Sequence, residues 1–318
     1  MVSAPGGHPA PTSFPVDFDL KVNAMTVPRR HFLQAAASLA VLPCLWPAHS
    51  VLQADENQAA SGTQMKLGLV TYEWGKNWDV PTLIKNCTAA NFSGVELRTT
   101  HKHGVEIKLD AAQREQVRKQ FADSAVAVVG LGSTCEYHAV DQAVVRKNIE
   151  ETKDFVRLSH DIGGTGVKVR PNGLPAQVPV EQTVTQIGAA LHEVAEFAKD
   201  FGQEIRVEVH GAGTSEVPVL HQIMQAANHK NAVVCWNCKK SDMNGAGLAA
   251  NFKLLQDKIR TVHIHDLTKN NYPWEELFTL LKGISFNGWT LMEESHVPDD
   301  IVAAMKENRA VWEKLTAG

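Results

Sequence analysis

The sequence is poor in cysteine, in excess basic charge and in long apolar runs, and each shortage excludes a class of protein. Five cysteines in 318 residues are too few for a disulfide framework. The formal net charge is -4, so we expect no nucleic-acid partner, because such a partner requires clustered lysine and arginine. The apolar run at residues 35–46 is too short to span a bilayer, so we expect no stable membrane anchor.

The N-terminal segment, residues 1–64, is rich in proline, alanine, glycine and serine and differs from the rest of the chain. Arg29 and Arg30 precede an apolar run that ends in an A-x-S pattern, an order similar to a twin-arginine export signal. We therefore predict a signal peptide at 1–50 and a flexible linker at 51–64, with the twin-arginine export machinery as a partner and the periplasm as the destination. The alternative is a disordered N-terminus of a cytoplasmic protein.

From residue 65 onward, short β-type runs alternate with helical patterns. The β-type runs cover residues 66–71, 94–98, 125–134, 166–170, 204–209, 232–237, 259–265 and 289–293. The helical patterns cover 79–91, 110–123, 141–161, 180–201, 216–227, 245–257, 274–283 and 297–315. Eight such units predict a parallel sheet closed into a single-domain α/β fold, a (β/α)8 TIM barrel over residues 65–318. An open doubly wound sheet would need a glycine-rich phosphate loop after its first strand, and residues 71–75 do not form one.

Polar residues two positions apart recur near the ends of these runs. Side chains alternate along a strand, so the two members of such a pair share one face, and the valines between them make the other face apolar. The pairs are Glu96/Arg98, Glu136/His138, Lys168/Arg170, Glu208/His210, Cys235/Asn237 and His263/His265. Because the carboxyl ends of barrel strands build the active site, we predict that these faces are pocket walls.

Four successive strand ends carry residues suited to a divalent cation: Glu208, Asn237, His263 and Glu293. Carboxylate and imidazole ligands that leave room for two substrate oxygens suit a cation that stabilises an enediolate. A carboxylate on each face can remove and return the weakly acidic proton of a C–H next to a carbonyl. This arrangement indicates the isomerisation or epimerisation of a sugar.

Three segments resemble the xylose-isomerase-like TIM barrels, a family of sugar phosphate isomerases and epimerases within the AP endonuclease 2-like superfamily. They are residues 207–211, 262–267 and 288–293, and the resemblance extends over about 65–315. It implies that Glu208, Asn237, His263 and Glu293 hold a divalent metal ion, which could be Mn, Mg, Co or Zn. It also implies that Glu208 and Glu293 form the catalytic acid/base pair.

Two positions depart from the family pattern. Asn237 stands where the family has an aspartate, and its amide brings no charge to a metal site. His210 or Asp242 could compensate for the missing charge. Lys240 stands where ketose epimerases carry a histidine, so substrate handling need not follow those enzymes.

The remaining inward residues are assigned to binding a small carbohydrate substrate: Glu136, His138, Lys168, Arg170, His210 and His265. Lys168 and Arg170 either bind an anionic group or hydroxyls of the substrate, or neutralise neighbouring glutamates. Glu208 could accordingly be a buried acid paired with one of them.

Three functions are compatible with these features. We expect a metal-dependent sugar isomerase or epimerase that abstracts a proton next to a carbonyl. The same chemistry would serve a lyase or dehydratase acting on oxidised (3-keto) sugars or glycosides, and a barrel that has lost catalysis would be a carbohydrate-binding protein. An apurinic endonuclease, which shares the fold, would need more metal ligands and a basic groove. The sequence leaves open whether the protein is a homo-oligomer.

Overall fold

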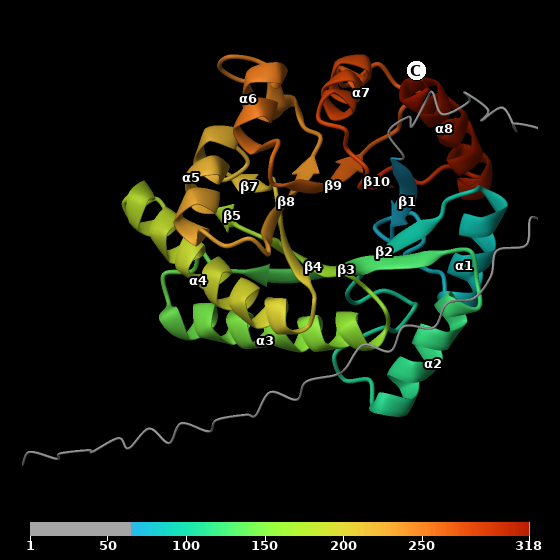
Figure 1. Ribbon diagram of the computed structural model, residues 1–318, viewed down its shortest axis with the longest axis horizontal. Helices are drawn as coiled ribbons and strands as arrows, with labels where there is room; N and C mark the ends of the chain where they lie inside the picture. Colours follow the sequence, from blue (N-terminus) through green and yellow to red (C-terminus); the bar gives the residue numbers. More distant parts are fainter. Residues whose placement is uncertain (1–64, 318) are drawn as a thin grey trace, which may run out of the picture. The chain divides into compact units, whose positions relative to one another are not determined.

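A closed barrel of eight parallel strands dominates the computed structural model, which describes residues 65–317 (Figure 1). In order around the barrel the strands are β1 (Lys66–Val70), β2 (Gly94–Arg98), β3 (Ala127–Glu136), β4 (Gly166–Arg170), β6 (Glu204–Glu208), β8 (Ala232–Asn237), β9 (Ile259–Ile264) and β10 (Trp289–Met292). Each strand pairs in parallel with the next, and β10 closes the ring onto β1. The prediction of a TIM barrel is confirmed.

Eight α-helices of the described residues surround the strands (Figure 1). They are α1 (Val80–Ala89), α2 (Ala111–Ala122), α3 (Gln142–Asp161), α4 (Val180–Asp200), α5 (Val217–Ala227), α6 (Leu248–Leu255), α7 (Trp274–Gly283) and α8 (Ile301–Thr316). Aspartates begin several of them: the side chains of Asp79, Asp110 and Asp300 each accept a hydrogen bond from a backbone N–H of the first turn. The last helix begins at residue 301, four residues later than predicted, because Asp300 is its cap.

The apolar face of each strand packs against the helices and forms one large core. Val95, Leu97, Val167 and Val169 are at most 1% exposed and belong to the same cluster as the inward residues of the helices. The predicted apolar outer face is therefore present on β2 and β4.

Three short elements near the strand ends were not predicted. β5 (Asn172–Gly173) and β7 (Gly211–Ala212) pair as a separate two-stranded sheet, and η1 (Lys240–Met243) is a 3-10 turn after β8. Asn172 has φ 62° and Gly211 has φ 94°, both in the left-handed region. A Cβ on Gly211 would collide with the Cα of Asn172, so the close approach of the two segments requires glycine there.

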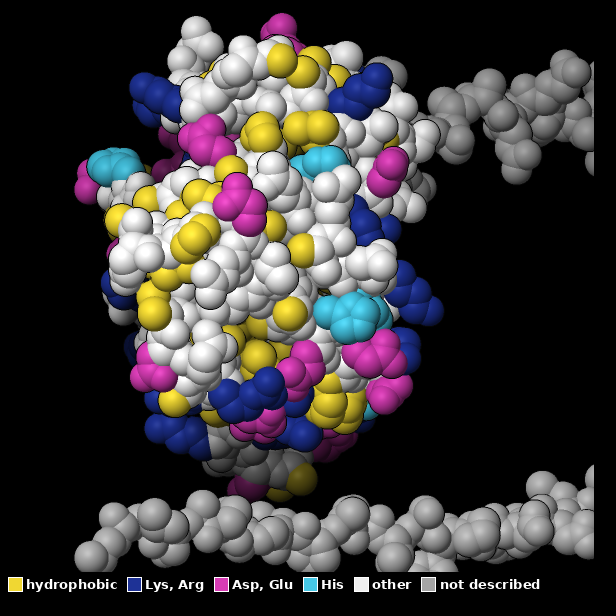
Figure 2. Space-filling model, turned by 90° about the vertical axis from the view of Figure 1, so that its left-hand side faces the viewer, with side chains coloured by type: hydrophobic (Ala, Val, Ile, Leu, Met, Phe, Trp, Pro, Cys, Tyr) yellow, Lys and Arg dark blue, Asp and Glu magenta, His cyan; other side chains and the backbone are white. Residues whose placement is uncertain are grey.

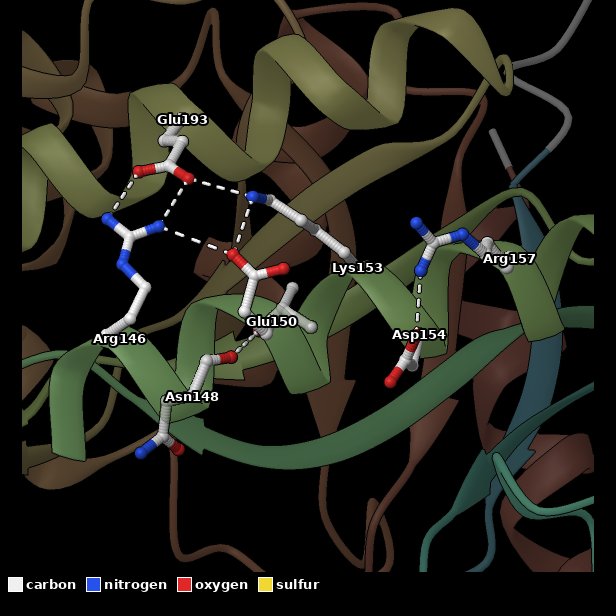
Figure 3. A network of polar contacts seen from close by, with 8 residues as sticks. Arg146, Asn148, Glu150, Lys153, Asp154, Arg157 and Glu193 are labelled. Atoms are coloured by element: carbon white, nitrogen blue, oxygen red, sulfur yellow. Dashed lines mark hydrogen bonds and ion pairs between the residues drawn. The ribbon is translucent and has the colours of Figure 1, made fainter. Parts of the chain in front are cut away.

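On the outside of the barrel, α3 and α4 lie side by side and are joined by a network of ion pairs (Figure 3). Arg146 Nη1 lies 2.7 Å from Glu193 Oε1, and Lys153 Nζ contacts Glu193 and Glu150 at 2.8 and 2.9 Å. Hydrogen bonding from Arg146 and Lys153 lowers the pKa of Glu193 to about 2. Because these side chains are partly exposed, solvent screens the pairs and their contribution to stability is small.

The predicted signal peptide at residues 1–50 and the predicted linker at 51–64 lie outside the described residues. Within residues 65–317, no helix combines the length and the apolar character that crossing a membrane requires.

Candidate active site

The carboxyl ends of the strands surround a cavity of about 180 Å³. Seven residues assigned to the site from the sequence line it: Lys168, Arg170, Glu208, His210, Asn237, His265 and Glu293. Arg98, predicted only as part of a pocket wall, also lines it, together with Tyr72 and Lys239, which were not predicted. His263 is fully buried and does not line the cavity. Glu136 and His138 do not line the cavity either.

Glu208, His263 and Glu293 converge at one point. Each offers a ligand atom, and these atoms all lie within 4.8 Å of one another. His263 Nδ1 lies 3.2 Å from Glu293 Oε2. The adjacent Glu294 instead accepts a hydrogen bond from the backbone N–H of Asp266, so the alternation of side chains places Glu293 in the cluster.

Both carboxylate oxygens of Glu208 accept hydrogen bonds. Lys168 Nζ donates to Oε2 at 2.7 Å, and Asn237 Nδ2 donates to Oε1 at 2.6 Å. Burial would raise the pKa of Glu208, but the Lys168 ammonium, helped by His263 and His210, holds it well below its usual value. Glu208 is therefore ionised. Lys168, which was assigned to substrate binding from the sequence, forms an ion pair with Glu208.

The carbonyl oxygen of Asn237 is free to coordinate a cation. A carboxylate only accepts hydrogen bonds, so the amide nitrogen must face Glu208. Oδ1 is then left buried without a hydrogen-bond partner among residues 65–317. Two carboxylates, one imidazole and one free carbonyl oxygen are donors that fit a divalent cation.

Asp242, offered as a compensating ligand from the sequence, does not join this cluster. Its Oδ2 accepts hydrogen bonds from the Tyr272 hydroxyl at 2.7 Å and from the backbone N–H of Lys239 at 2.9 Å. Burial raises the pKa of Asp242 to about 6. The hypothesis that Asp242 compensates for Asn237 is wrong, because its side chain serves to hold the turn after β8.

Comparison with known families decides the classification. Residues 84–315 match the family model described as xylose isomerase-like TIM barrel. The chain belongs to this family. The matched segment includes Glu208, Asn237, His263 and Glu293, so the resemblance seen in the sequence is confirmed.

Similar proteins share this fold at low sequence identity. A curated relative, L-ribulose 3-epimerase of Mesorhizobium japonicum, is 21% identical over 272 residues, which cover 79% of this chain and 88% of the relative. The structure of the IolI protein with a bound zinc atom has a TM-score of 0.68 and 16% identity, covering 79% of this chain and 98% of that chain. The apo structure of 3-keto-D-glucoside 4-epimerase from E. coli has a TM-score of 0.65 and 12% identity, covering 79% and 99%.

In this xylose isomerase-like barrel, Glu96 lies behind His263. Its carboxylate oxygens are 3.5 Å from His263 Nε2, and its side chain is 1% exposed. Burial disfavours a charged imidazole, but Cys235, and after it Glu293 and Glu96, hold the pKa of His263 well above its usual value. Glu96 was recognised only as an inward-facing acid, and the structure shows that it orients the histidine.

Glu136 and His138, both assigned to substrate binding from the sequence, are each 25% exposed and do not line the cavity. Glu136 Oε1 accepts hydrogen bonds from Arg170 Nη2 and Asn172 Nδ2, and His138 Nδ1 lies 3.8 Å from Glu136 Oε2. The structure therefore gives Glu136 a supporting place beneath Arg170 and Asn172.

The hydrogen bonds around Asn172 fix which nitrogen of His210 carries the proton. Asn172 Nδ2 donates to Glu136, so its Oδ1 must be the acceptor for His210 Nδ1 at 2.7 Å. Burial, together with Lys239 and Arg170, lowers the pKa of His210, although Glu208 acts in the opposite sense. The imidazole is thus neutral at neutral pH and leaves Nε2 as an acceptor. In the same way, His265 Nδ1 donates to the backbone oxygen of Glu293 at 2.7 Å.

Replacing Asn172 with glycine should release this control of His210. Glycine tolerates the left-handed backbone of residue 172 but removes the amide, so we expect His210 to populate both tautomers instead of one. Heteronuclear NMR of the histidine rings, with the His210 signals assigned from a His210→Gln variant, measures the tautomer. Asn228→Gly is the matched control, because Asn228 is also left-handed, at φ 41°, and caps α5. Unchanged His210 signals in Asn172→Gly would contradict the proposed hydrogen-bond chain.

Proposed function

We propose that the protein is a metal-dependent sugar isomerase or epimerase that moves a proton next to a carbonyl group. The observation that carries this proposal is the convergence of Glu208, His263 and Glu293 within 4.8 Å at the end of a barrel. The curated relative is an L-ribulose 3-epimerase, which supports the same class of reaction. A cavity of about 180 Å³ is smaller than the roughly 300–1,000 Å³ of sites for drug-sized ligands and suits one monosaccharide.

Four residues would hold the divalent ion: Glu208, Asn237, His263 and Glu293. A bound ion would supply positive charge that stabilises negative charge developing on the substrate oxygens. The zinc atom in the IolI structure supports an ion in this family of barrels. The mixed set of carboxylate, amide and imidazole donors is compatible with Mn, Mg, Co or Zn.

Glu208 and Glu293 would act as the acid/base pair. Glu208 ends β6 and Glu293 follows β10, with β8 and β9 between them, so their carboxylates approach a ligand from two directions. Burial would raise the pKa of Glu293, but His263 holds it below its usual value, so the carboxylate is ready to accept a proton. Glu293 Oε2 faces His263, and Oε1 makes no hydrogen bond within residues 65–317, so Oε1 is the atom that would receive the proton.

Proton exchange with solvent tests the proposal. The full chain is incubated in heavy water containing Mn, in separate samples with L-ribulose, D-psicose and a 3-keto-D-glucoside. Mass spectrometry then measures the deuterium incorporated on the carbon next to the carbonyl. We expect incorporation with at least one sugar, and a loss of roughly a hundredfold or more on chelation, restored by Mn, because Lewis-acid stabilisation contributes several kcal/mol. Exchange that resists chelation would refute metal dependence. Sugar binding without any exchange would refute catalysis.

Elimination from an oxidised glycoside is the second candidate. The fold is similar to that of 3-keto-D-glucoside 4-epimerase. The histidine of ketose epimerases is replaced by Lys240, which does not line the cavity, whereas the neighbouring Lys239 does, so substrate handling need not follow those enzymes. In the same incubations, released aglycone would indicate elimination, whereas a sugar of unchanged mass apart from deuterium would indicate isomerisation or epimerisation.

A further inference from the structure

Four cationic side chains line the cavity of a chain that is acidic as a whole. Arg98, Lys168, Arg170 and Lys239 face only two lining carboxylates, although the formal net charge of the chain is -4. On the molecular face in Figure 2, acidic and basic side chains are interspersed and form no continuous basic surface. The positive lining of the cavity is therefore a local feature.

Glu208, one of the two lining carboxylates, is already engaged, and Lys168 is one of the cations that engages it. Lys168 and Asn237 occupy the two oxygens of Glu208, and His263 lies against Oε2 of Glu293. Glu293 Oε1 is therefore the one oxygen of the two lining carboxylates that has no polar partner within residues 65–317.

The two arginines, in contrast, keep unused donors. Arg170 Nη2 donates to Glu136 Oε1 at 2.6 Å, and its Nη1 makes no hydrogen bond within residues 65–317. Arg98 forms no ion pair with a carboxylate among the described residues: its Nη1 lies 3.4 Å from His101 Nε2, and its guanidinium lies over the Tyr72 ring at 5.0 Å. Stacking on an aromatic ring fixes the plane of a guanidinium, whose paired N–H groups match the oxygens of a carboxylate or phosphate.

The position of Arg98 in the barrel is opposite the acid/base pair. In either direction around the barrel, three strands lie between β2, which carries Arg98, and β8, and β8 lies between the strands of Glu208 and Glu293. A monosaccharide whose reacting carbon lies at the carboxylates would direct its far end toward Arg98, while Arg170, on β4 next to the strand of Glu208, lines the same cavity.

We propose that the substrate is an acidic monosaccharide whose terminal carboxylate or phosphate binds Arg98 and Arg170. The inference rests on the proposed sugar isomerase or epimerase for the reaction and adds the class of substrate. Glu136 supports Arg170 from behind, and Tyr72 supports Arg98. A neutral sugar would leave the free donors of both arginines without a charged partner.

Calorimetric titration tests the proposal with three ligands that differ only at the terminal carbon: D-fructose, D-fructuronate and D-fructose phosphorylated on that carbon. The full chain is titrated with chelator, so that nothing turns over, and again with Mn. We expect at least one acid to bind about tenfold or more tightly than D-fructose, which corresponds to about 1.4 kcal/mol. The affinity for this acid should fall as the salt concentration rises. The tighter of the two acids distinguishes carboxylate from phosphate.

Variants assign the effect to the arginines. Arg98→Gln should remove most of the preference for the acid while the weak binding of D-fructose is retained. Arg98→Lys should keep part of this preference, because lysine keeps the positive charge but lacks the paired N–H groups of the guanidinium. Arg146→Gln on α3, a loss of the same charge outside the cavity, should keep the full preference. Equal affinity for all three ligands, or a preference unaffected by Arg98→Gln in a protein with unchanged melting temperature, would overturn the proposal.

The two proposals fail in different ways. Preferential binding of an acid without proton exchange in heavy water would leave the anion site standing and refute the isomerase. Exchange with a neutral sugar and no preference for an acid would leave the isomerase standing and refute the anion site.

Discussion

Replacing Glu293 with glutamine should lower turnover by about a thousandfold while the barrel stays folded. Glutamine has nearly the same shape but cannot accept a proton, and general acid/base catalysis contributes roughly 10²–10⁴-fold. Glu293 lies just after β10 beside the buried His263, whose imidazole keeps Glu96 at 3.5 Å and the amide oxygen of the new glutamine as partners, so we expect the fold to be retained. The expected result is a loss in the rate of proton exchange at saturating sugar, measured together with an unchanged thermal melting curve.

The neighbouring acid supplies the control. Glu294→Gln keeps an oxygen that can accept the hydrogen bond from the backbone N–H of Asp266, and its side chain points away from the cluster. We expect this variant to retain the exchange rate of the parent. The reverse outcome, with Glu294→Gln inactive and Glu293→Gln active, would show that Glu294, and not Glu293, points into the cavity.

The acid cluster was predictable because it depends on two local rules. Alternation along a strand sorted Glu208 and His263 onto inward faces, Glu293 was chosen as the residue that ends its strand, and the carboxyl ends of parallel strands meet at one end of a barrel. Neither rule depends on side-chain contacts between different strands. The same rules applied to β3 placed Glu136 and His138 in the cavity wall, where the structure does not have them.

The failure at β3 has a physical cause. β3 ends at Glu136, so His138 lies beyond the strand, where alternation no longer sets the direction of a side chain. The pairing of β3 with β4 shifts by two residues between Gly132 and Glu136, which keeps Glu136 on the inward face, but its carboxylate pairs with Arg170 and Asn172. Asn172 was missed for a related reason: a two-residue strand has no periodicity, and its left-handed backbone becomes visible only in three dimensions. Arg98 was recognised as inward-facing, but its lack of a carboxylate partner depends on side-chain contacts across the barrel.

Replacing Lys168 with methionine should destabilise the metal-free protein by about 3–5 kcal/mol, because it leaves the Glu208 charge buried without its ion partner. The two side chains are 4% and 3% exposed, and the ammonium is 2.7 Å from the carboxylate. Urea denaturation with chelator present measures the loss. The corresponding change on the surface, Lys153→Met between α3 and α4, should cost at most about 1 kcal/mol.

A double-mutant cycle separates the ion pair from packing. Glu208→Gln alone should also destabilise the protein, because Lys168 is then the unpaired charge, whereas Lys168→Met with Glu208→Gln should recover much of the loss. Additive losses would contradict a direct pair. Recovery would show that stability alone does not require these charges, since a neutral pair serves the fold nearly as well. The charged pair would then be explained by chemistry, because the Lys168 ammonium holds the pKa of Glu208 low and keeps its carboxylate ionised in a fully buried position.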